Sequence, residues 1–209
     1  MTARLWQALT VSLWLCLALL APAAWSDASG GGLKPDVRLL IDISGSMKES
    51  DPDNLRAPAL ELIVRLLPEG SRAGVWIFGE EVEELVPHRV VDAAWREQAQ
   101  AAISAIDNSG QRTNIPAALA AATYDLQRMD PGYRTSIVLL TDGKVDVSQS
   151  PVVNATAARK LLAEEAPGLG RTGIPVHTIA LSEEADWTFL RSLAQSTGGI
   201  AEEAGTAEE

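Results

Sequence analysis

Three short stretches of the sequence place hydroxyl and carboxylate side chains at close spacing. The first is Asp42-Ile43-Ser44-Gly45-Ser46, in which every second residue carries an oxygen donor. The second is Thr113-Asn114, and the third is Thr141-Asp142-Gly143. None of them contains histidine or cysteine, and oxygen ligands alone suit hard cations such as Mg²⁺ or Mn²⁺. The residue types therefore predict a divalent-cation site, provided that the fold brings the three stretches together.

The elements expected around these stretches alternate between strands and helices. Short apolar runs bounded by turn residues predict strands at 37–43, 72–78, 82–90, 135–140, 174–181 and 200–203. Apolar residues at helical spacing predict helices at 55–67, 92–106, 114–129, 155–165 and 185–196, with a loop at 168–173. This alternation predicts an α/β fold with a central, mainly parallel sheet, one antiparallel edge strand at 82–90 and helices on both faces.

The predicted sheet gives the three stretches a common location. The first stretch ends the strand at 37–43, the third follows the strand at 135–140, and the second opens the helix at 114–129. Ligands of such sheets bind outside the carboxyl ends of the strands. We therefore expect the oxygen-bearing side chains to meet at one edge of the sheet.

In this order and spacing, the motifs resemble those of the von Willebrand factor type A (VWA) domains, which have a Rossmann-like α/β fold. Their metal-ion-dependent adhesion site (MIDAS) uses D-x-S-x-S, a distant threonine and a distant aspartate. The matching residues here are Asp42, Ser44, Ser46, Thr113 and Asp142. The resemblance implies that both serines bind the metal directly and that Thr113 binds it directly or through water. The two aspartates are then expected to act through water or as hydrogen-bond acceptors.

The resemblance also implies binding rather than catalysis. A dication held largely by neutral hydroxyls keeps much of its charge and can accept a further carboxylate from outside. We therefore expect a module that depends on Mg²⁺, with Mn²⁺ as the other candidate, and that binds a protein presenting Asp or Glu to the metal. Asp51-Pro52 matches a turn that is common in bacterial members of the family.

Two other functions stay open on the sequence. A hydrolase could use the same metal, or it could use Ser44, Asp142 and His177 as a triad. However, Ser44 lacks the G-x-S-x-G turn that exposes a nucleophile, and His177 falls inside a predicted strand, where a packed histidine is expected. The third possibility is an assembly part of a larger envelope protein whose metal site is unused.

The first residues of the chain have the layout of an export signal. Residues 1–26 contain one arginine, an apolar run and then small residues around a proline, as in a secretory signal peptide. An uncleaved anchor is the alternative, because 5–24 is nearly long enough to span a bilayer. Residues 27–34 then form a Gly/Ser-rich linker, and 35–209 form the VWA domain, which lacks part of its expected last helix. The expected location is the periplasm or the cell envelope.

The composition narrows the classes of partner. The chain of 209 residues has 17 Lys and Arg against 28 Asp and Glu, a net charge of −11. Nucleic-acid binding is not expected, because it needs clustered basic residues. Membrane association is expected only through an uncleaved signal or through the missing C-terminal region. The only cysteine, Cys16, lies in the signal segment, so no disulfide is expected in the domain.

Two further residues carry expectations of their own. Arg112 directly precedes Thr113, where VWA domains often have glycine, and it either points into solvent or reaches over the metal site. His88 falls near the end of a predicted strand and is expected at the surface.

Overall fold

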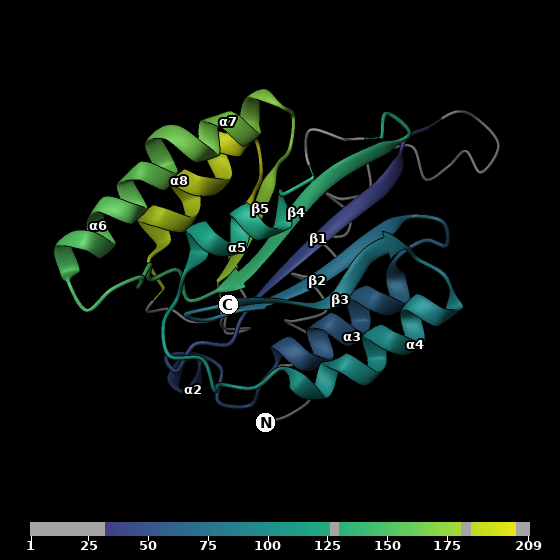
Figure 1. The fold of residues 1–209 in the computed structure, drawn as a ribbon, viewed down its shortest axis with the longest axis horizontal. Coiled ribbons are helices and arrows are strands. Elements are labelled where there is room, and N and C mark those ends of the chain that lie inside the picture. The colour runs from purple at the N-terminus through teal and green to yellow at the C-terminus, as the bar shows by residue number, and fades with distance from the viewer. Residues whose placement is uncertain (1–31, 126–129, 181–184, 204–209) are drawn as a thin grey trace, which may run out of the picture.

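The computed structural model describes residues 32–125, 130–180 and 185–203, which form one six-stranded sheet with helices packed on both faces (Figure 1). The predicted signal peptide and most of the linker lie outside the described residues. The strands are β1 (Lys34–Asp42), β2 (Arg72–Phe78), β3 (Val82–Val90), β4 (Tyr133–Thr141), β5 (Val176–Ala180) and β6 (Ala201–Glu203). The α-helices are α2 (Met47–Ser50), α3 (Arg56–Leu66), α4 (Ala93–Ala102), α5 (Ile115–Ala122), α6 (Pro151–Lys160), α7 (Ala166–Arg171) and α8 (Trp187–Thr197).

The strands lie in the order β3-β2-β1-β4-β5-β6. β1 pairs in parallel with both β2 and β4, whereas β3 pairs antiparallel with β2 at the edge of the sheet. The predicted fold class, a mainly parallel sheet with one antiparallel edge strand, is therefore confirmed. Apolar residues predominate in the central strands because helices cover both of their faces, as expected for buried parallel strands.

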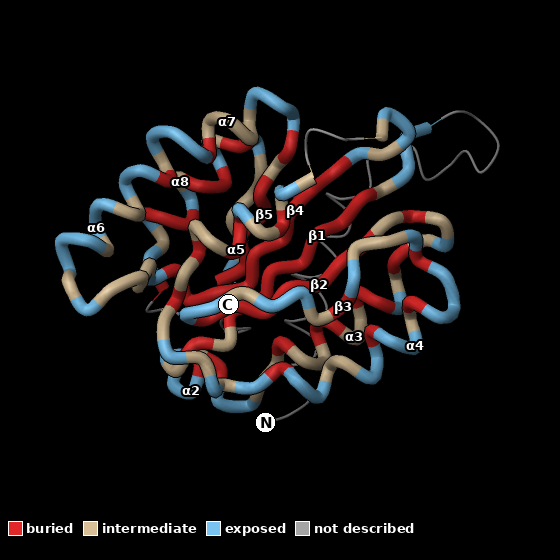
Figure 2. Tube along the Cα trace, viewed as in Figure 1, coloured by how far each residue is buried: buried red, intermediate tan, exposed pale blue. Residues whose placement is uncertain are grey.

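Alternating side chains of the strands fill two separate cores, seen as buried backbone on either side of the sheet (Figure 2). Leu39 and Ile41 of β1 face α3 and α4, where the core includes the fully buried Trp95. Leu40 points to the other face, where the core includes Leu119 of α5. Helices α5, α7 and α8 cover that second face (Figure 1).

The helix predicted at 114–129 is shorter in the structure, because α5 ends at Ala122. The Thr123 hydroxyl donates to the carbonyl oxygen of Leu119, and the guanidinium of Arg38 donates to the carbonyl oxygen of Ala122. These groups satisfy carbonyls that a longer helix would have used. Residues 126–129 of the predicted helix lie outside the described residues.

The loop predicted at 168–173 is also wrong in part, because α7 continues to Arg171. A five-residue π-helical turn at Leu161–Glu165 joins α6 to α7. Pro167 follows this turn and has no N–H to donate to the carbonyl one α-helical turn earlier, so a local change of helical register is an expected response. α7 is helical although it contains a proline and two glycines, residue types that usually end a helix.

His88 is not the surface residue that the sequence predicts, since its side chain is only 7% exposed. Its Nε2 atom lies 2.6 Å from Oδ1 of Asp36. The other oxygen of Asp36 accepts hydrogen bonds from Thr135, at 3.0 Å, and from Arg38, at 3.2 Å. Arg38 also pairs with Asp125 at 2.5 Å. This polar cluster lies near the amino end of the sheet, beyond the last turn of α5.

The polar cluster makes the free energy of unfolding depend on pH in the acidic range. Burial raises the pKa of Asp36, but the hydrogen bond and charge of His88 and the charge of Arg38 outweigh it, and the resulting pKa lies below its ordinary value. A carboxyl whose pKa is lower in the folded state stabilises the fold above its unfolded pKa, and this contribution is lost as the pH falls through the folded pKa.

We therefore expect the free energy of unfolding to fall below about pH 4. In Asp36→Asn, the free energy of unfolding should fall less steeply at acidic pH, as measured by urea unfolding between pH 2.5 and 7. A fall as steep in Asp36→Asn as in the original protein would show that Asp36 is not the responsible group.

Candidate functional site

The carboxyl ends of β1 and β4 bring the two predicted aspartates to the same edge of the sheet. Ile41 of β1 is in register with Leu140 of β4, so that Asp42 and Thr141 lie side by side where the strands end. The Thr141 hydroxyl donates to Oδ2 of Asp42 at 2.5 Å. Asp142 follows directly, and both aspartates are buried.

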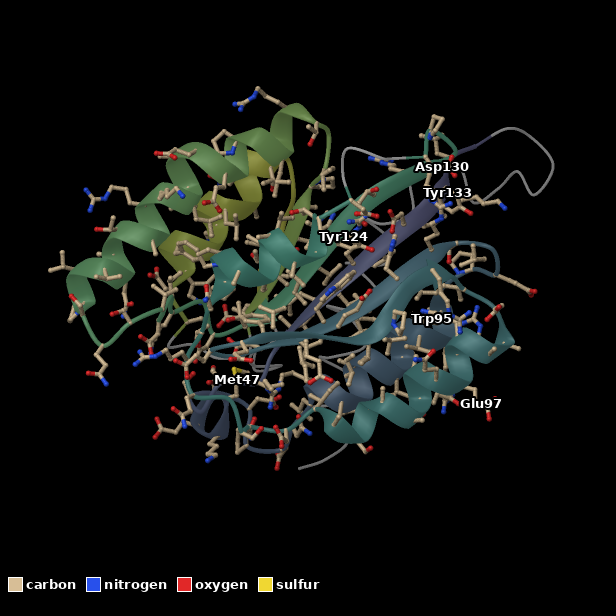
Figure 3. The ribbon with its side chains drawn as sticks, in the orientation of Figure 1. Met47, Trp95, Glu97, Tyr124, Asp130 and Tyr133 are labelled. Atoms are coloured by element: carbon tan, nitrogen blue, oxygen red, sulfur yellow. The ribbon has the colours of Figure 1, made fainter. Side chains whose placement is uncertain are left out.

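The D-x-S-x-S stretch folds into a tight turn that places its two hydroxyls together. The N–H of Ser44 donates to Oδ1 of Asp42 at 2.8 Å, and the Oγ atoms of Ser44 and Ser46 lie 3.1 Å apart. Met47, which begins α2 directly after this turn, has a fully buried side chain (Figure 3). Oxygens at adjacent corners of an octahedron around Mg²⁺ lie about 3.0 Å apart, given Mg–O distances of about 2.1 Å. The spacing of the two serine hydroxyls therefore fits neighbouring ligands of such an ion.

The loop before α5 packs against this turn through close backbone contacts. The N–H of Gly110 donates to the carbonyl oxygen of Ile43 at 2.9 Å, and the N–H of Asn114 donates to the carbonyl oxygen of Gly79 at 3.0 Å. A Cβ atom at Gly110 would lie 2.9 Å from the carbonyl oxygen of Ile43, so only glycine allows this approach. The loop thus carries the buried Thr113 to the same edge of the sheet as Ser44.

Thr113 is held by a second loop, the one that follows β4. Its N–H and carbonyl group both pair with the backbone of Asp146, at 3.0 Å each. The Oδ1 atom of Asp146 also accepts from Arg112 at 3.2 Å, and Arg112 lies 3.5 Å from Glu80. The side chain of Arg112 is 21% exposed, so it is neither free in solvent nor bonded to any of the predicted metal-binding side chains.

Asp142 has the weakest hydrogen bonds of the buried site. It is 2% exposed, yet among the described residues the partners of its two oxygens lie at 3.4 Å, the hydroxyl of Ser50 and the N–H of Lys144. A buried carboxylate is costly without strong partners. Such a group fits a position beside a cation, and the donor set of carboxylates and hydroxyls suits Mg²⁺ or Mn²⁺.

Hydroxyls are needed to complete any metal site here. Among the described residues, no group of three or more His, Cys, Asp and Glu side chains could hold a metal ion. The predicted site instead combines two aspartates with the hydroxyl residues Ser44, Ser46 and Thr113 at one edge of the sheet.

The surroundings of Asp42 disfavour its charged form. Burial raises the pKa of Asp42 to about 6, helped by the negative charge of Asp142 and opposed by hydrogen bonds from Thr141 and Ser44. A dication beside the pair would favour the charged forms, because an opposite charge lowers the pKa of a carboxyl.

A buried arginine under the site was missed by the sequence analysis. Arg56 is fully buried, and its Nε atom donates to Asp51 at 2.7 Å. Its guanidinium also donates to the carbonyl oxygen of Asp42 and to Oδ1 of Asn108. One signal was available, because Arg56 precedes Leu60 by four residues and so falls on the apolar stripe of its helix.

The serine-hydrolase triad is not assembled. The hydroxyl of Ser44 lies beside Ser46 at the carboxyl edge, whereas His177 lies inside β5, three residues before Ala180. Three residues of strand correspond to about 10 Å. Burial, followed by the charge of Arg134, lowers the pKa of His177, as for a packed neutral histidine.

Together, these features define a doubly wound α/β domain with a hydroxyl-and-carboxylate site at the carboxyl edge of its sheet. The chain belongs to the von Willebrand factor type A domain family, whose sequence model matches residues 36–206.

Solved structures with the same fold include proteins of quite different origin. A von Willebrand factor type A protein from Catenulispora acidiphila has a TM-score of 0.65 at 19% identity, over 83% of this chain and 39% of that one. The conserved hypothetical protein BatB from Bacteroides thetaiotaomicron has a TM-score of 0.60 at 19% identity, over 82% and 90%. Proximal thread matrix protein 1 from the mussel byssus, with a zinc-occupied MIDAS motif, has a TM-score of 0.59 at 20% identity, over 82% and 44%.

The chain thus spans well under half the length of the Catenulispora protein. Among curated protein sequences, no relative matches the chain. In the part of the chain that the structure describes, no helix is both long and apolar enough to cross a bilayer.

Proposed function

We propose that this domain binds a protein partner through a divalent metal ion, Mg²⁺ or Mn²⁺, at the carboxyl edge of its sheet. Ser44, Ser46 and Thr113 would hold the ion, and Asp42 and Asp142 would act through water or as acceptors behind it. The observation that carries the proposal is the 3.1 Å separation of the two serine hydroxyls beside two buried aspartates.

The same geometry explains why an acidic partner would be bound. Neutral hydroxyl ligands offset little of the charge of a dication, which is then able to attract a carboxylate. An Asp or Glu of the partner would supply the further ligand. The relative with a zinc-occupied MIDAS motif supports metal binding by this fold, although it does not identify the metal of this chain. We propose no catalytic step with the triad considered above, since Ser44 lies at the carboxyl edge and His177 lies inside β5.

We further propose that residues 1–26 direct export, so that the domain acts in the periplasm or at the cell envelope. The charged start and short apolar run of this segment support the proposal. If the segment is retained as an anchor, the domain would be tied to the membrane.

Thermal and urea unfolding in EDTA, Mg²⁺ and Mn²⁺ test the metal site. A metal that binds only the folded state adds about 2.7 kcal/mol at 100 times its dissociation constant. We expect this gain in the original protein and its loss in Asp42→Ala and Thr113→Ala. The exposed Thr188 provides a matched control, because Thr188→Ala should keep the full gain. No gain in the original protein at millimolar metal would overturn the proposal.

A further inference from the structure

A segment without charged residues follows the loop that pairs with Thr113. The uncharged segment, residues 147–158, has twelve consecutive residues without Asp, Glu, Lys or Arg, in a chain that is 22% charged. It covers the end of the loop after β4 and most of α6. Val152 is 74% exposed and Val153 is 47% exposed. Two adjacent aliphatic side chains are therefore open to solvent at the start of a helix.

The fold does not need these valines for its core. α6 contains no buried residue, and it lies at the outer end of the helical layer (Figure 1). Only the inner side of the helix, through Ala158, packs against the second core. Since the exposed valines do not stabilise the sheet, their apolar surface is available to another molecule.

Hydrogen bonds tie this surface to the metal-binding loop. Asn154, in the first turns of α6, donates to Oδ1 of Asp146 at 2.9 Å. Its Oδ1 atom accepts from the N–H groups of Val147, at 3.0 Å, and Ser148, at 2.9 Å. Asp146 in turn pairs with the backbone of Thr113. The start of α6 is therefore held in a fixed relation to the edge of the sheet where Thr113 lies.

We propose that the uncharged segment is a second contact surface for the partner that binds the metal, and that it receives an aliphatic or aromatic side chain close to the partner's acidic residue. This inference rests on the proposed function. Depletion of charged residues is what distinguishes the cores of protein interfaces from other surfaces. A contact at Val152 and Val153 would add to the metal contact, because the second contact of a linked pair forms at high effective concentration.

A lysine in the loop between the candidate metal site and the exposed valines also suits an acidic partner. Lys144 follows Asp142 by two residues and is exposed, and within the described residues it forms no ion pair. It lies in the loop between the metal site and α6. An acidic segment crossing this loop would meet one open positive charge in a chain of net charge −11.

A random library of displayed 12-residue peptides, selected on the protein in Mn²⁺ and released with EDTA, tests the inference. We expect the EDTA-released peptides to combine Asp or Glu with Val, Ile, Leu or Phe at a preferred spacing. Synthetic copies should bind the Val152→Ser/Val153→Ser variant about 10- to 100-fold more weakly than the original protein. Ala155→Glu, at another exposed position of the same segment, should weaken them as well.

Two controls separate the contact surface from the metal site. Val90→Ser removes another exposed valine, at the far end of β3, and should leave peptide affinity unchanged. Mn²⁺ affinity without peptide, measured by calorimetry, should be the same in the original protein and in Val152→Ser/Val153→Ser.

EDTA-sensitive peptides that bind the double variant with full affinity would overturn the inference and leave the proposed function intact. The same holds for concentration-dependent dimers that the double variant abolishes, since the surface would then receive a second copy. If Mn²⁺ binds but no peptide is released by EDTA, the inference also fails. Failure of Mn²⁺ to bind at all would instead overturn the proposed function, and the inference with it.

Discussion

Arg56→Ala is expected to lower the free energy of unfolding by about 3–5 kcal/mol, the usual cost of removing one partner of a buried ion pair. Arg56 is fully buried and pairs with Asp51, which is 2% exposed. Without the guanidinium, the carboxylate of Asp51 keeps its bonds to the N–H groups of residues 55 and 56 but loses the ion pair with Arg56. Urea unfolding at pH 7 measures the change.

The same substitution is expected to weaken metal binding by about 10- to 100-fold, the range typical of groups that orient metal ligands. Arg56 donates both to the carbonyl oxygen of Asp42 and to Asn108, so it holds the end of β1 against the loop that leads to Thr113. Calorimetric titration with Mg²⁺ and Mn²⁺, under conditions in which the variant is folded, measures this effect. Unchanged metal affinity in folded Arg56→Ala would show that the arginine acts on stability alone.

Arg38→Ala is expected to destabilise the protein by a similar amount, about 3–5 kcal/mol, for the same reason. The guanidinium of Arg38 lies between Asp36 and Asp125 and also donates to the carbonyl oxygen that ends α5. Its removal would leave the carboxylates of Asp36 and Asp125 near His88 without the guanidinium that pairs with both. Urea unfolding again gives the free energy.

The metal affinity of Arg38→Ala should equal that of the original protein, because the polar cluster lies at the amino end of the strands and the metal site at the carboxyl end. The two arginine variants therefore form a matched pair, with similar burial and a similar expected loss of stability but different expected effects on the site. A weakened metal site in Arg38→Ala would contradict this separation and would indicate coupling along β1.

The central strands and their terminal aspartates are predictable because their signals are local. Buried parallel strands are rich in apolar residues, and 37–43 and 135–140 are short segments in which apolar residues predominate. Once these strands are parallel neighbours, the residues at their ends must meet at one edge. The antiparallel edge strand β3 is likewise signalled by the short turn before it.

The placement of charged residues was less predictable. His88 and Asp36 are 52 residues apart in the chain, as are Arg56 and Asn108. A sequence pattern shows that a residue is charged, and the expected position of a charged residue is the surface. Whether it is buried depends on partners that only folding brings near, so the sequence pattern predicts His88 at the surface and gives Arg56 no role.

The residue at which α5 ends also depends on a partner that is distant in the sequence. The alanine-rich pattern continues the helix past Ala122, but Arg38 binds the carbonyl oxygen of that residue from a strand 84 positions earlier. Helix ends are set by whatever satisfies their last carbonyls, and here the partner is distant in sequence.

The sequence by itself therefore determined the α/β class, the strands and the identity of the oxygen donors, because periodicity and residue type are local properties. Only the tertiary structure decided that the serine hydroxyls lie 3.1 Å apart, that Arg56 supports the edge of the sheet and that Asn154 links α6 to Thr113. These are relations between segments, and their geometry is set by the packing of the whole domain.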